Sequence, residues 1–259
     1  GVTGYVLSQS YLTVDQNTNS SFDFWNFQNS GEFPSASALY LDSIPIQNVT
    51  GPPENGFEGL SIFTHFSHFQ DWTSASGSGC NYVVWTLGEC YNPNLSWSNI
   101  DTSLSLTFEY QDVLTLRVMH NGVEYTRVST GVDVDDKDSI SAVVRVDKNG
   151  HYSLAVKNHT DNTTVSAANT GSNWGTTLLH NTAISNPDKR DFVAGAGLQY
   201  TTTTINVNGQ NTPVLSRALH SCMGGVIHDL KIWSTDIGYK AQDQLVNLQY
   251  SEVGNVFYD

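Results

Sequence analysis

The sequence predicts an all-β fold, a jelly-roll sandwich of two antiparallel sheets with at most one short C-terminal helix. Two observations carry this prediction. Short runs in which apolar and polar residues alternate recur along the chain, and turn-forming Asn-Gly pairs follow or separate several of them. Because successive side chains of a strand point to opposite faces of a sheet, each run buries one face and leaves the other in water.

The clearest alternating runs lie in the middle of the chain. They cover residues 104–108, 114–118 and 152–156. Asn-Gly pairs begin at Asn121, Asn149 and Asn208, and each supplies two residues that tolerate positive φ, as a two-residue type I′ hairpin requires. Such frequent hairpins predict an antiparallel meander or Greek key packed as a sandwich.

Helical spacing is confined to one segment near the C-terminus. Leu245 and Leu248 share a face over residues 241–250, which predicts a short helix against the edge of the sandwich. The four threonines at residues 201–204 predict a loop or an edge strand. No linker or repeat interrupts the pattern, and all-β sandwiches of this length are common, so we expect residues 1–259 to form one domain.

Composition excludes two classes of partner. The chain has 25 Asp and Glu against 11 Lys and Arg, a formal net charge of −14. Such a polyanionic surface repels nucleic acid and acidic membranes. No stretch approaches the roughly 20 apolar residues that a membrane-spanning helix needs, so we expect no membrane insertion.

Glycosylation sequons and cysteines indicate the secretory pathway. Asn-x-Ser/Thr sequons occur at Asn19, Asn48, Asn94, Asn158 and Asn162. We expect two or more to be occupied, which predicts a secreted, extracellular protein.

The three cysteines allow one disulfide and leave one thiol over. A bridge between Cys80 and Cys90 would close a local loop and is plausible in an oxidising compartment, although Cys222 can pair with either.

Several segments are similar to the laminin-G-like, concanavalin A-like jelly-roll superfamily. The clearest likeness is Gly-Gly-Val-Ile-His-Asp-Leu-Lys-Ile-Trp at residues 224–233, which resembles the final "G-x-I-x-D-v-x-I-W" strand. Further likenesses lie at residues 38–46, 59–66, 114–122 and 139–158. The resemblance implies the sandwich fold. It leaves function open, because this superfamily includes lectins, adhesion domains, glycosidases and lyases.

Catalytic constellations are not apparent in the sequence. A retaining glycosidase needs two carboxyl groups about 5–5.5 Å apart, and no matching strand pattern occurs. His65 and His68 face opposite ways on a strand, so we interpret that strand as a core strand with one solvent-facing histidine. His228 shares a predicted face with Val226 and Leu230 and is expected to be a core histidine.

A cluster of aspartates is a candidate calcium site. Asp133, Asp135, Asp136 and Asp138 lie within six residues and offer carboxylate oxygens of the kind that Ca²⁺ binds. The EF-hand spacing is missing, however. A solvated acidic turn between two strands is the alternative.

Tryptophans in polar surroundings are candidates for glycan contact, because an indole face can stack on a sugar ring. They are Trp25, Trp72, Trp97 and Trp174. Partial burial under loops is the alternative for all four. Trp85 and Trp233 lie within strand patterns and are expected to be core or edge residues.

Together these observations predict a secreted, non-catalytic glycoprotein module that binds a glycan or an extracellular protein. One alternative is a structural subunit of an extracellular polymer, which would assemble through Cys222 and the aromatic residues 22–27. The other is a carbohydrate-active enzyme, either a lyase or a glycosidase, whose active site the sequence does not reveal.

Overall fold

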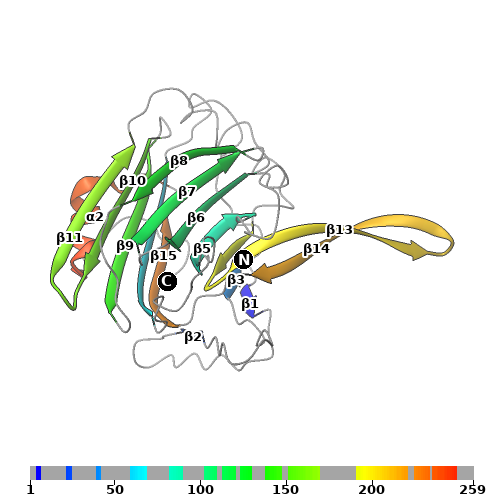
Figure 1. Ribbon diagram of the computed structural model, residues 1–259, viewed down its shortest axis with the longest axis horizontal. Helices are drawn as coiled ribbons and strands as arrows, with labels where there is room; N and C mark the ends of the chain where they lie inside the picture. Colours follow the sequence, from blue (N-terminus) through cyan, green and yellow to red (C-terminus); the bar gives the residue numbers. More distant parts are fainter. Residues whose placement is uncertain are drawn as a thin grey trace.

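The computed structural model describes two large antiparallel sheets, a projecting hairpin and one helix (Figure 1). The described residues are 4–6, 22–24, 39–41, 59–68, 82–89, 102–109, 113–120, 123–129, 138–147, 151–169, 191–220, 225–233 and 235–249. This architecture confirms the predicted all-β sandwich. The three clearest alternating runs all fall within strands.

The first sheet has seven strands, and every neighbouring pair in it is antiparallel. Its order is β1 (Gly4–Val6), β3 (Leu39–Leu41), β12 (Phe192–Ala194), β5 (Tyr82–Gly88), β6 (Thr102–Glu109), β7 (Val113–His120) and β8 (Val123–Ser129). Neighbours such as β12 and β5 are far apart in sequence, so crossing connections hold the sheet together.

The second sheet has six strands and is also antiparallel. Its order is β11 (Thr163–Asn169), β10 (Tyr152–Asn158), β9 (Ser139–Val146), β4 (Leu60–His68), β15 (Gly225–Trp233) and β2 (Phe22–Phe24). The separate hairpin pairs β13 (Gly197–Val207) with β14 (Gln210–His220). Its turn residues Asn208 and Gly209 have φ of 53° and 83°, which confirms the type I′ hairpin expected there.

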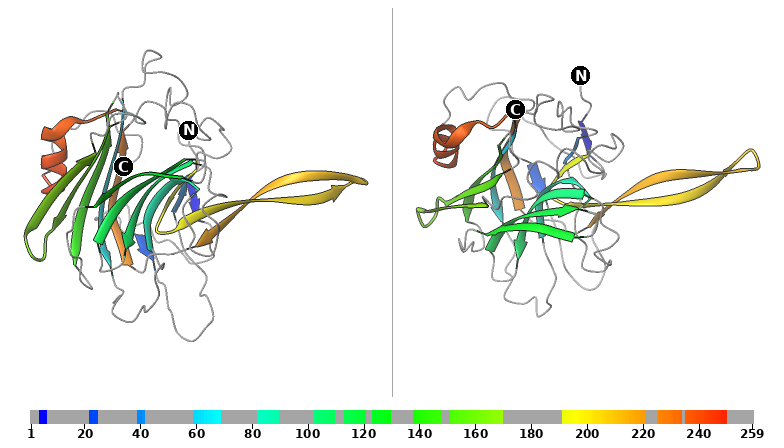
Figure 2. Two further views of the ribbon diagram at one scale, coloured as in Figure 1. Left: turned by 45° about the horizontal axis from the view of Figure 1, so that its top comes forward. Right: turned by 90° about the horizontal axis from the view of Figure 1, so that it is seen from above.

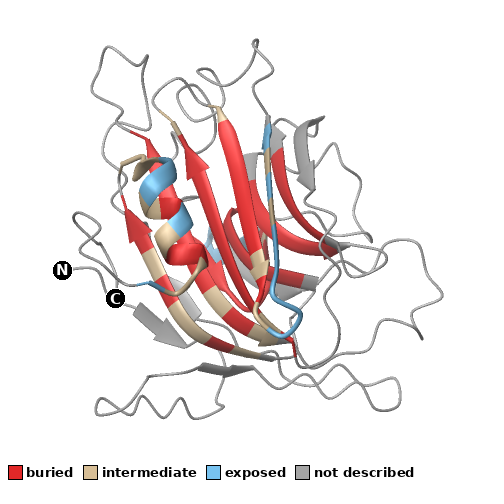
Figure 3. Cartoon of the chain, turned by 90° about the vertical axis from the view of Figure 1, so that its left-hand side faces the viewer, coloured by how far each residue is buried: buried red, intermediate tan, exposed pale blue. Residues whose placement is uncertain are grey.

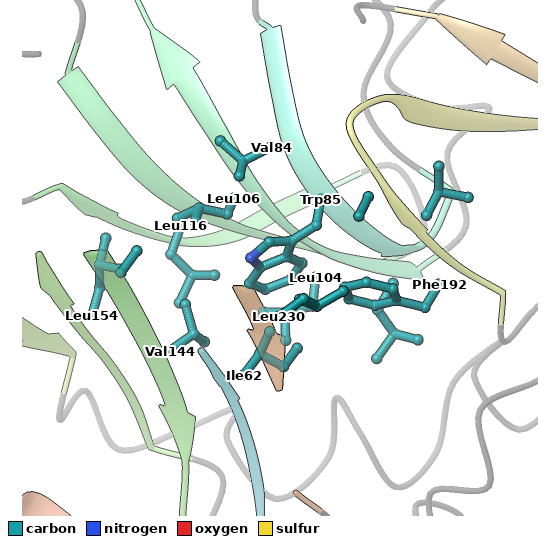
Figure 4. Packing of buried hydrophobic residues seen from close by; sticks show 14 of the residues in the cluster. Ile62, Val84, Trp85, Leu104, Leu106, Leu116, Val144, Leu154, Phe192 and Leu230 are labelled. Atoms are coloured by element: carbon teal, nitrogen blue, oxygen red, sulfur yellow. The ribbon is translucent and has the colours of Figure 1, made fainter. Parts of the chain in front are cut away.

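The main core fills the space between the two large sheets (Figure 4). Leu104 and Leu106 of β6 face Ile62 and Val144 of the opposite sheet, and all four side chains are buried. Trp85 is fully buried and stacks on Phe192 with ring centroids 5.7 Å apart. Each large apolar side chain buried in this way contributes about 1.5–3 kcal/mol, so this interface is the main source of stability.

A smaller cluster lies on the other face of the six-stranded sheet, under helix α2 (Gly238–Val246). Phe63, Val143 and Trp233 rise from the strands to meet Leu245 and Val246 of the helix. Figure 3 shows the helix seated on this face. Trp85 and Trp233, expected to be core or edge residues, are both buried core residues.

The predicted helix was placed too late in the chain. It begins at Gly238 and ends at Val246 instead of spanning residues 241–250. Leu248 has φ of 56°, a left-handed conformation that ends the helix. Leu248 still packs against the cluster under the helix, so the apolar spacing identified the correct face but the wrong ends.

Arg145 of β9 fixes the helix to the sheet. Its side chain is buried, and its Nε and Nη2 donate to the two carboxylate oxygens of Asp236 at 2.6 and 2.9 Å. Nη1 donates to Oε1 of Gln242 at 3.0 Å, and the ring of Tyr239 covers the guanidinium at 4.1 Å. This bidentate pair gives both charge compensation and a fixed direction.

Close backbone packing reinforces the same contact. Gly59 has φ of 110°, and a Cβ there would lie 2.5 Å from the carbonyl oxygen of Val146 and 2.6 Å from the amide nitrogen of Asp236. Only glycine permits both the conformation and this approach. The start of β4, the end of β9 and the segment before α2 therefore meet without intervening side chains.

We predict that Asp236→Ala lowers the free energy of unfolding by about 2–3 kcal/mol, because it leaves the charge of Arg145 buried without its carboxylate. Urea denaturation followed by tryptophan fluorescence measures the change. Asp243→Ala, on an exposed position of the same helix, is the matched control and should shift stability by less than about 0.5 kcal/mol. Equal effects of the two substitutions would contradict the role assigned to Arg145.

Candidate functional site

The outer face of the six-stranded sheet is divided into two halves. Helix α2 covers the apolar half. Beside it lies a polar half, which we call the histidine strip, formed by β4, β9, β15 and the end of β10. Its members are His65, Ser67, Ser139, Ser141, His159 and His228. All of them except Ser141 keep partial exposure, whereas both faces of β5, β6 and β7 are buried wherever their side chains are described.

Each histidine of the strip shares a hydrogen bond with a serine on another strand or segment. His65 Nε2 lies 2.9 Å from Ser139 Oγ, and His228 Nε2 lies 2.9 Å from Ser67 Oγ. His159 Nε2 lies 2.6 Å from Ser141 Oγ. Because these pairs cross between neighbouring strands, the backbone ladder fixes the position of every ring.

The three rings also contact one another. The centroid of the His65 ring is 4.8 Å from that of His228 and 5.8 Å from that of His159. Burial, with smaller contributions from His228 and His159, lowers the pKa of His65 from 6.5 to about 4. Burial and the nearby charge of Lys157 lower the pKa of His159. At neutral pH both rings are therefore uncharged.

The placement of His228 differs from the sequence expectation. Alternation put it on the core face with Leu230, but the ladder between β15 and β4 shifts register between Ile227 and Asp229. Ile227 and Leu230 are buried in the core, while His228 is half-buried and bonded to Ser67 on the outer face. The prediction was wrong because a β-bulge inserts an extra residue and reverses the alternation beyond it.

His65 lies where alternation predicts. It shares the outer face of β4 with Phe63 and Ser67, and its backbone pairs with Ser141 of β9 and Asp229 of β15. The sequence could not show that two further histidines reach the same place. His159 follows β10 and His228 lies on β15, so only the strand order brings them to His65.

Charged groups border the strip on two sides. Lys157 of β10 donates to Oδ1 of Asn247 at 2.7 Å, which ties that lysine to the end of the helix segment. On β15, Lys231 Nζ lies 3.6 Å from Asp229 Oδ1. The strip is thus a band of hydrogen-bonded histidines and serines, bordered by the charge of Lys157 on one side and by the Lys231–Asp229 pair on the other.

Another polar cluster lies at the base of the projecting hairpin. The Tyr200 hydroxyl donates to Oδ2 of Asp191 at 2.9 Å, and the Tyr200 amide nitrogen donates to Oε1 of Glu89 at 3.2 Å. All three residues are buried. Glu89 is isolated in the sequence, because Asp191 and Tyr200 lie about a hundred residues further along the chain. This cluster joins the hairpin to the seven-stranded sheet.

Most site residues predicted from the sequence lie outside the described part of the chain, so those assignments stay predictions. They are Trp25, Trp72, Trp97, Trp174, Asp133, Asp135, Asp136, Cys80, Cys90, Cys222, Asn19, Asn48 and Asn94. Asp138, Asn158 and Asn162 are described.

Asp138 and Asn158 form one buried unit at the C-terminal end of β10. The Asn158 amide nitrogen donates to Oδ2 of Asp138 at 2.5 Å and to Oδ2 of Asp161 at 3.4 Å, while its Oδ1 accepts from the backbone nitrogens of Thr160 and Asp161. Asn162, at the tip of the same turn, is exposed with φ of 58°. Asp138 is thus engaged in fixing this turn.

Neither a metal cluster nor a membrane-spanning helix is found in the residues that the structure describes. In that part of the chain, no group of three or more His, Cys, Asp or Glu side chains is arranged to hold a metal ion. No described helix is long and apolar enough to cross a bilayer. The calcium site stays a prediction.

Comparison with known proteins supports the fold rather than a function. No family model matches the chain, and no curated protein matches its sequence. Among solved structures, HCR/D-Sa-GBL1/C is similar with a TM-score of 0.53 at 10% identity, over 96% of this chain and 48% of that one. This chain therefore spans about half the length of that protein.

Two further solved structures are more distant. A heptameric SAP-like pentraxin from Limulus polyphemus has a TM-score of 0.46 at 11% identity, over 89% of this chain and 81% of that one. The LG1-3 region of the laminin alpha2 chain has a TM-score of 0.41 at 11% identity, over 83% and 34%. At such identities a likeness concerns the fold alone. With its two antiparallel sheets in jelly-roll order, the chain has the concanavalin A-like fold that the sequence resemblance implied.

Proposed function

We propose that this chain is a secreted, non-catalytic binding module that recognises a glycan through the histidine strip. One observation carries the proposal. Three serine–histidine pairs lie side by side on the part of the sheet face that α2 leaves uncovered. The jelly-roll fold does not itself decide function, because it supports binding modules and enzymes alike.

The chemistry of the strip suits a ligand rich in hydroxyl groups. A neutral imidazole has one donor and one acceptor nitrogen, and a serine hydroxyl both donates and accepts. Sugar hydroxyls have the same dual character. Since burial keeps His65 and His159 uncharged at neutral pH, both rings retain an acceptor nitrogen under these conditions.

The strip is also held in place before a ligand arrives. The serine partners of the three rings sit on β4 and β9, central strands with neighbours on both sides, and Arg145 fixes the adjacent helix. Side chains that are already ordered lose little conformational entropy on binding, so weak polar contacts yield more affinity. A strip of this kind favours recognition of a rigid ring over a flexible peptide.

Two features argue for binding over catalysis. A general base works best when its pKa is near the operating pH, and a pKa of about 4 makes His65 a poor base at neutral pH. Among the residues that the structure describes, neither His65 nor His159 hydrogen-bonds to a carboxylate that would orient it as in a hydrolase triad. The four tryptophans named above stay predicted glycan contacts, and the aspartate cluster stays a predicted calcium site.

We predict that His65→Leu weakens binding of the glycan identified on a glycan array by about tenfold or more, because it removes a polar group from the centre of the strip. Isothermal titration calorimetry measures the affinity. His151→Leu is the matched control, since His151 pairs with Asp147 on the β9–β10 turn away from the strip. Unchanged affinity of the His65 variant would contradict the proposal, as would turnover of the ligand by the wild-type protein.

We predict that the protein loses stability as the pH falls from 6.5 towards 4. The pKa of His65 is lowered in the folded state, so in this window the unfolded chain binds more protons and acidification favours unfolding. Urea denaturation at several pH values should give a shallower pH dependence for His65→Gln than for the wild type. Identical slopes would show that His65 is not held neutral by burial.

We predict that a glycan occupies Asn162 but not Asn158. The side-chain nitrogen of Asn158 is buried and uses both of its hydrogens in hydrogen bonds, so a sugar attached there would replace one hydrogen and break at least one bond, whereas Asn162 is exposed at a turn. Peptide mapping after enzymatic deglycosylation in heavy-oxygen water marks occupied sites in protein secreted by eukaryotic cells. A mark at Asn158 in folded protein would contradict the buried position described above.

A further inference from the structure

The hairpin of β13 and β14 leaves the sandwich and projects into solvent (Figure 2). Its lower part packs against β5 and β12, where Leu198 is buried. Beyond that point, all residues from 202 to 213 are exposed, including Ile205 at 46% and Val207 at 45%. A two-stranded ribbon alone in water is only marginally stable, so we expect a partner to stabilise a projecting hairpin of this length.

The composition of the projecting hairpin sets it apart from the rest of the chain. Residues 192–216 contain no Asp, Glu, Lys or Arg, although 14% of the whole chain is charged and the net charge is −14. Two copies of so acidic a protein repel each other over most surfaces. The hairpin is a segment on which two copies can approach without placing like charges together.

One edge of the hairpin offers a continuous row of backbone groups. Val207 and Gln210 flank the two-residue turn as a hydrogen-bonded pair, and bonded pairs alternate with non-bonded pairs along the ladder. The backbone groups of Thr202, Thr204 and Asn206 therefore point away from β14. Tyr200, the next residue in this series, confirms the alternation, because its N–H leaves the hairpin to reach Glu89.

The other edge is interrupted. Pro213 pairs with Thr204 across the ladder at a non-bonded position, so its nitrogen lies on the outer edge of β14 and has no hydrogen to donate. Proline on an edge strand blocks further pairing. A further strand can therefore pair with the β13 edge of the hairpin, whereas Pro213 hinders such pairing at the β14 edge.

The base of the hairpin is anchored. Tyr200 bonds both Glu89 and Asp191, and these three side chains are buried against the seven-stranded sheet. A hairpin fixed at its base presents its open edge in a defined direction, which lowers the entropic cost of pairing.

We propose that β13 pairs edge to edge with β13 of a second copy of this chain, forming a four-stranded sheet between two molecules. The pairing is antiparallel about a two-fold axis, as expected for a contact between identical surfaces. With Thr204 opposite its counterpart, Thr202 lies opposite Asn206 of the second copy, and each outward-pointing backbone group finds a partner. On one face, Ile205 of each copy then lies beside Thr203 of the other.

This assembly is independent of the glycan-binding strip, and its test uses the full chain. Sedimentation-velocity ultracentrifugation should show a dimer for the wild type. Thr204→Lys places two positive charges opposite each other on the axis and should raise the dimer dissociation constant about tenfold or more. Asn211→Lys is the matched control, because Asn211 is exposed on β14, the strand that carries Pro213, and this variant should remain dimeric.

A charge-swap experiment tests the register itself. At a concentration near the wild-type dissociation constant, Thr204→Lys and Thr204→Glu chains should each be mostly monomeric alone and should form a mixed dimer when combined, since a two-fold pairing puts residue 204 opposite itself. Thr202→Pro removes one outward N–H without touching the bonds between β13 and β14 and should also give monomer. A monomeric wild type, or single variants that stay dimeric, would overturn the proposal.

Discussion

The seating of α2 on the six-stranded sheet, held by Arg145 and Asp236, is the constraint on which the rest of this surface depends. A sheet face that is apolar throughout needs a cover, and one that is polar throughout gives a helix nothing to bury. This face is split. Phe63, Val143 and Trp233 supply the apolar half, and the ion pair fixes the helix over them. The polar half is left accessible beside a rigid border.

Histidines suit such a half-buried polar band better than carboxylates or lysines. Burial beside a packed helix penalises a charge, and an imidazole can give up its proton near neutral pH and still make hydrogen bonds. The lowered pKa of His65 reflects this adjustment. The serine partners take part of the hydrogen-bonding capacity of each ring and fix its orientation. The same physics that makes the rings poor bases makes them suitable receptors for neutral polar groups.

Local patterns in the sequence predicted the sheets well and the site poorly. Alternation located β6, β7 and β10, and Asn208 with Gly209 located the hairpin turn, because these signals depend on neighbouring residues alone. The bulge in β15 leaves no local signal, so His228 was assigned to the wrong face. The partners of His65 and Glu89 come from distant strands, and only the strand order determines which residues meet. The sequon at Asn158 shows a similar limit, since the motif does not reveal burial.

The central claim is that the three strip histidines form one receptor for a glycan. Nitrogen-15 NMR of the imidazole rings during a glycan titration at neutral pH tests it most directly. We predict that the signals of His65, His159 and His228 shift together with one affinity, with His65 and His159 in neutral forms, while the signal of His151 on the distant turn stays unchanged. Shifts confined to other histidines, or a charged His65 or His159 ring at neutral pH, would contradict this claim.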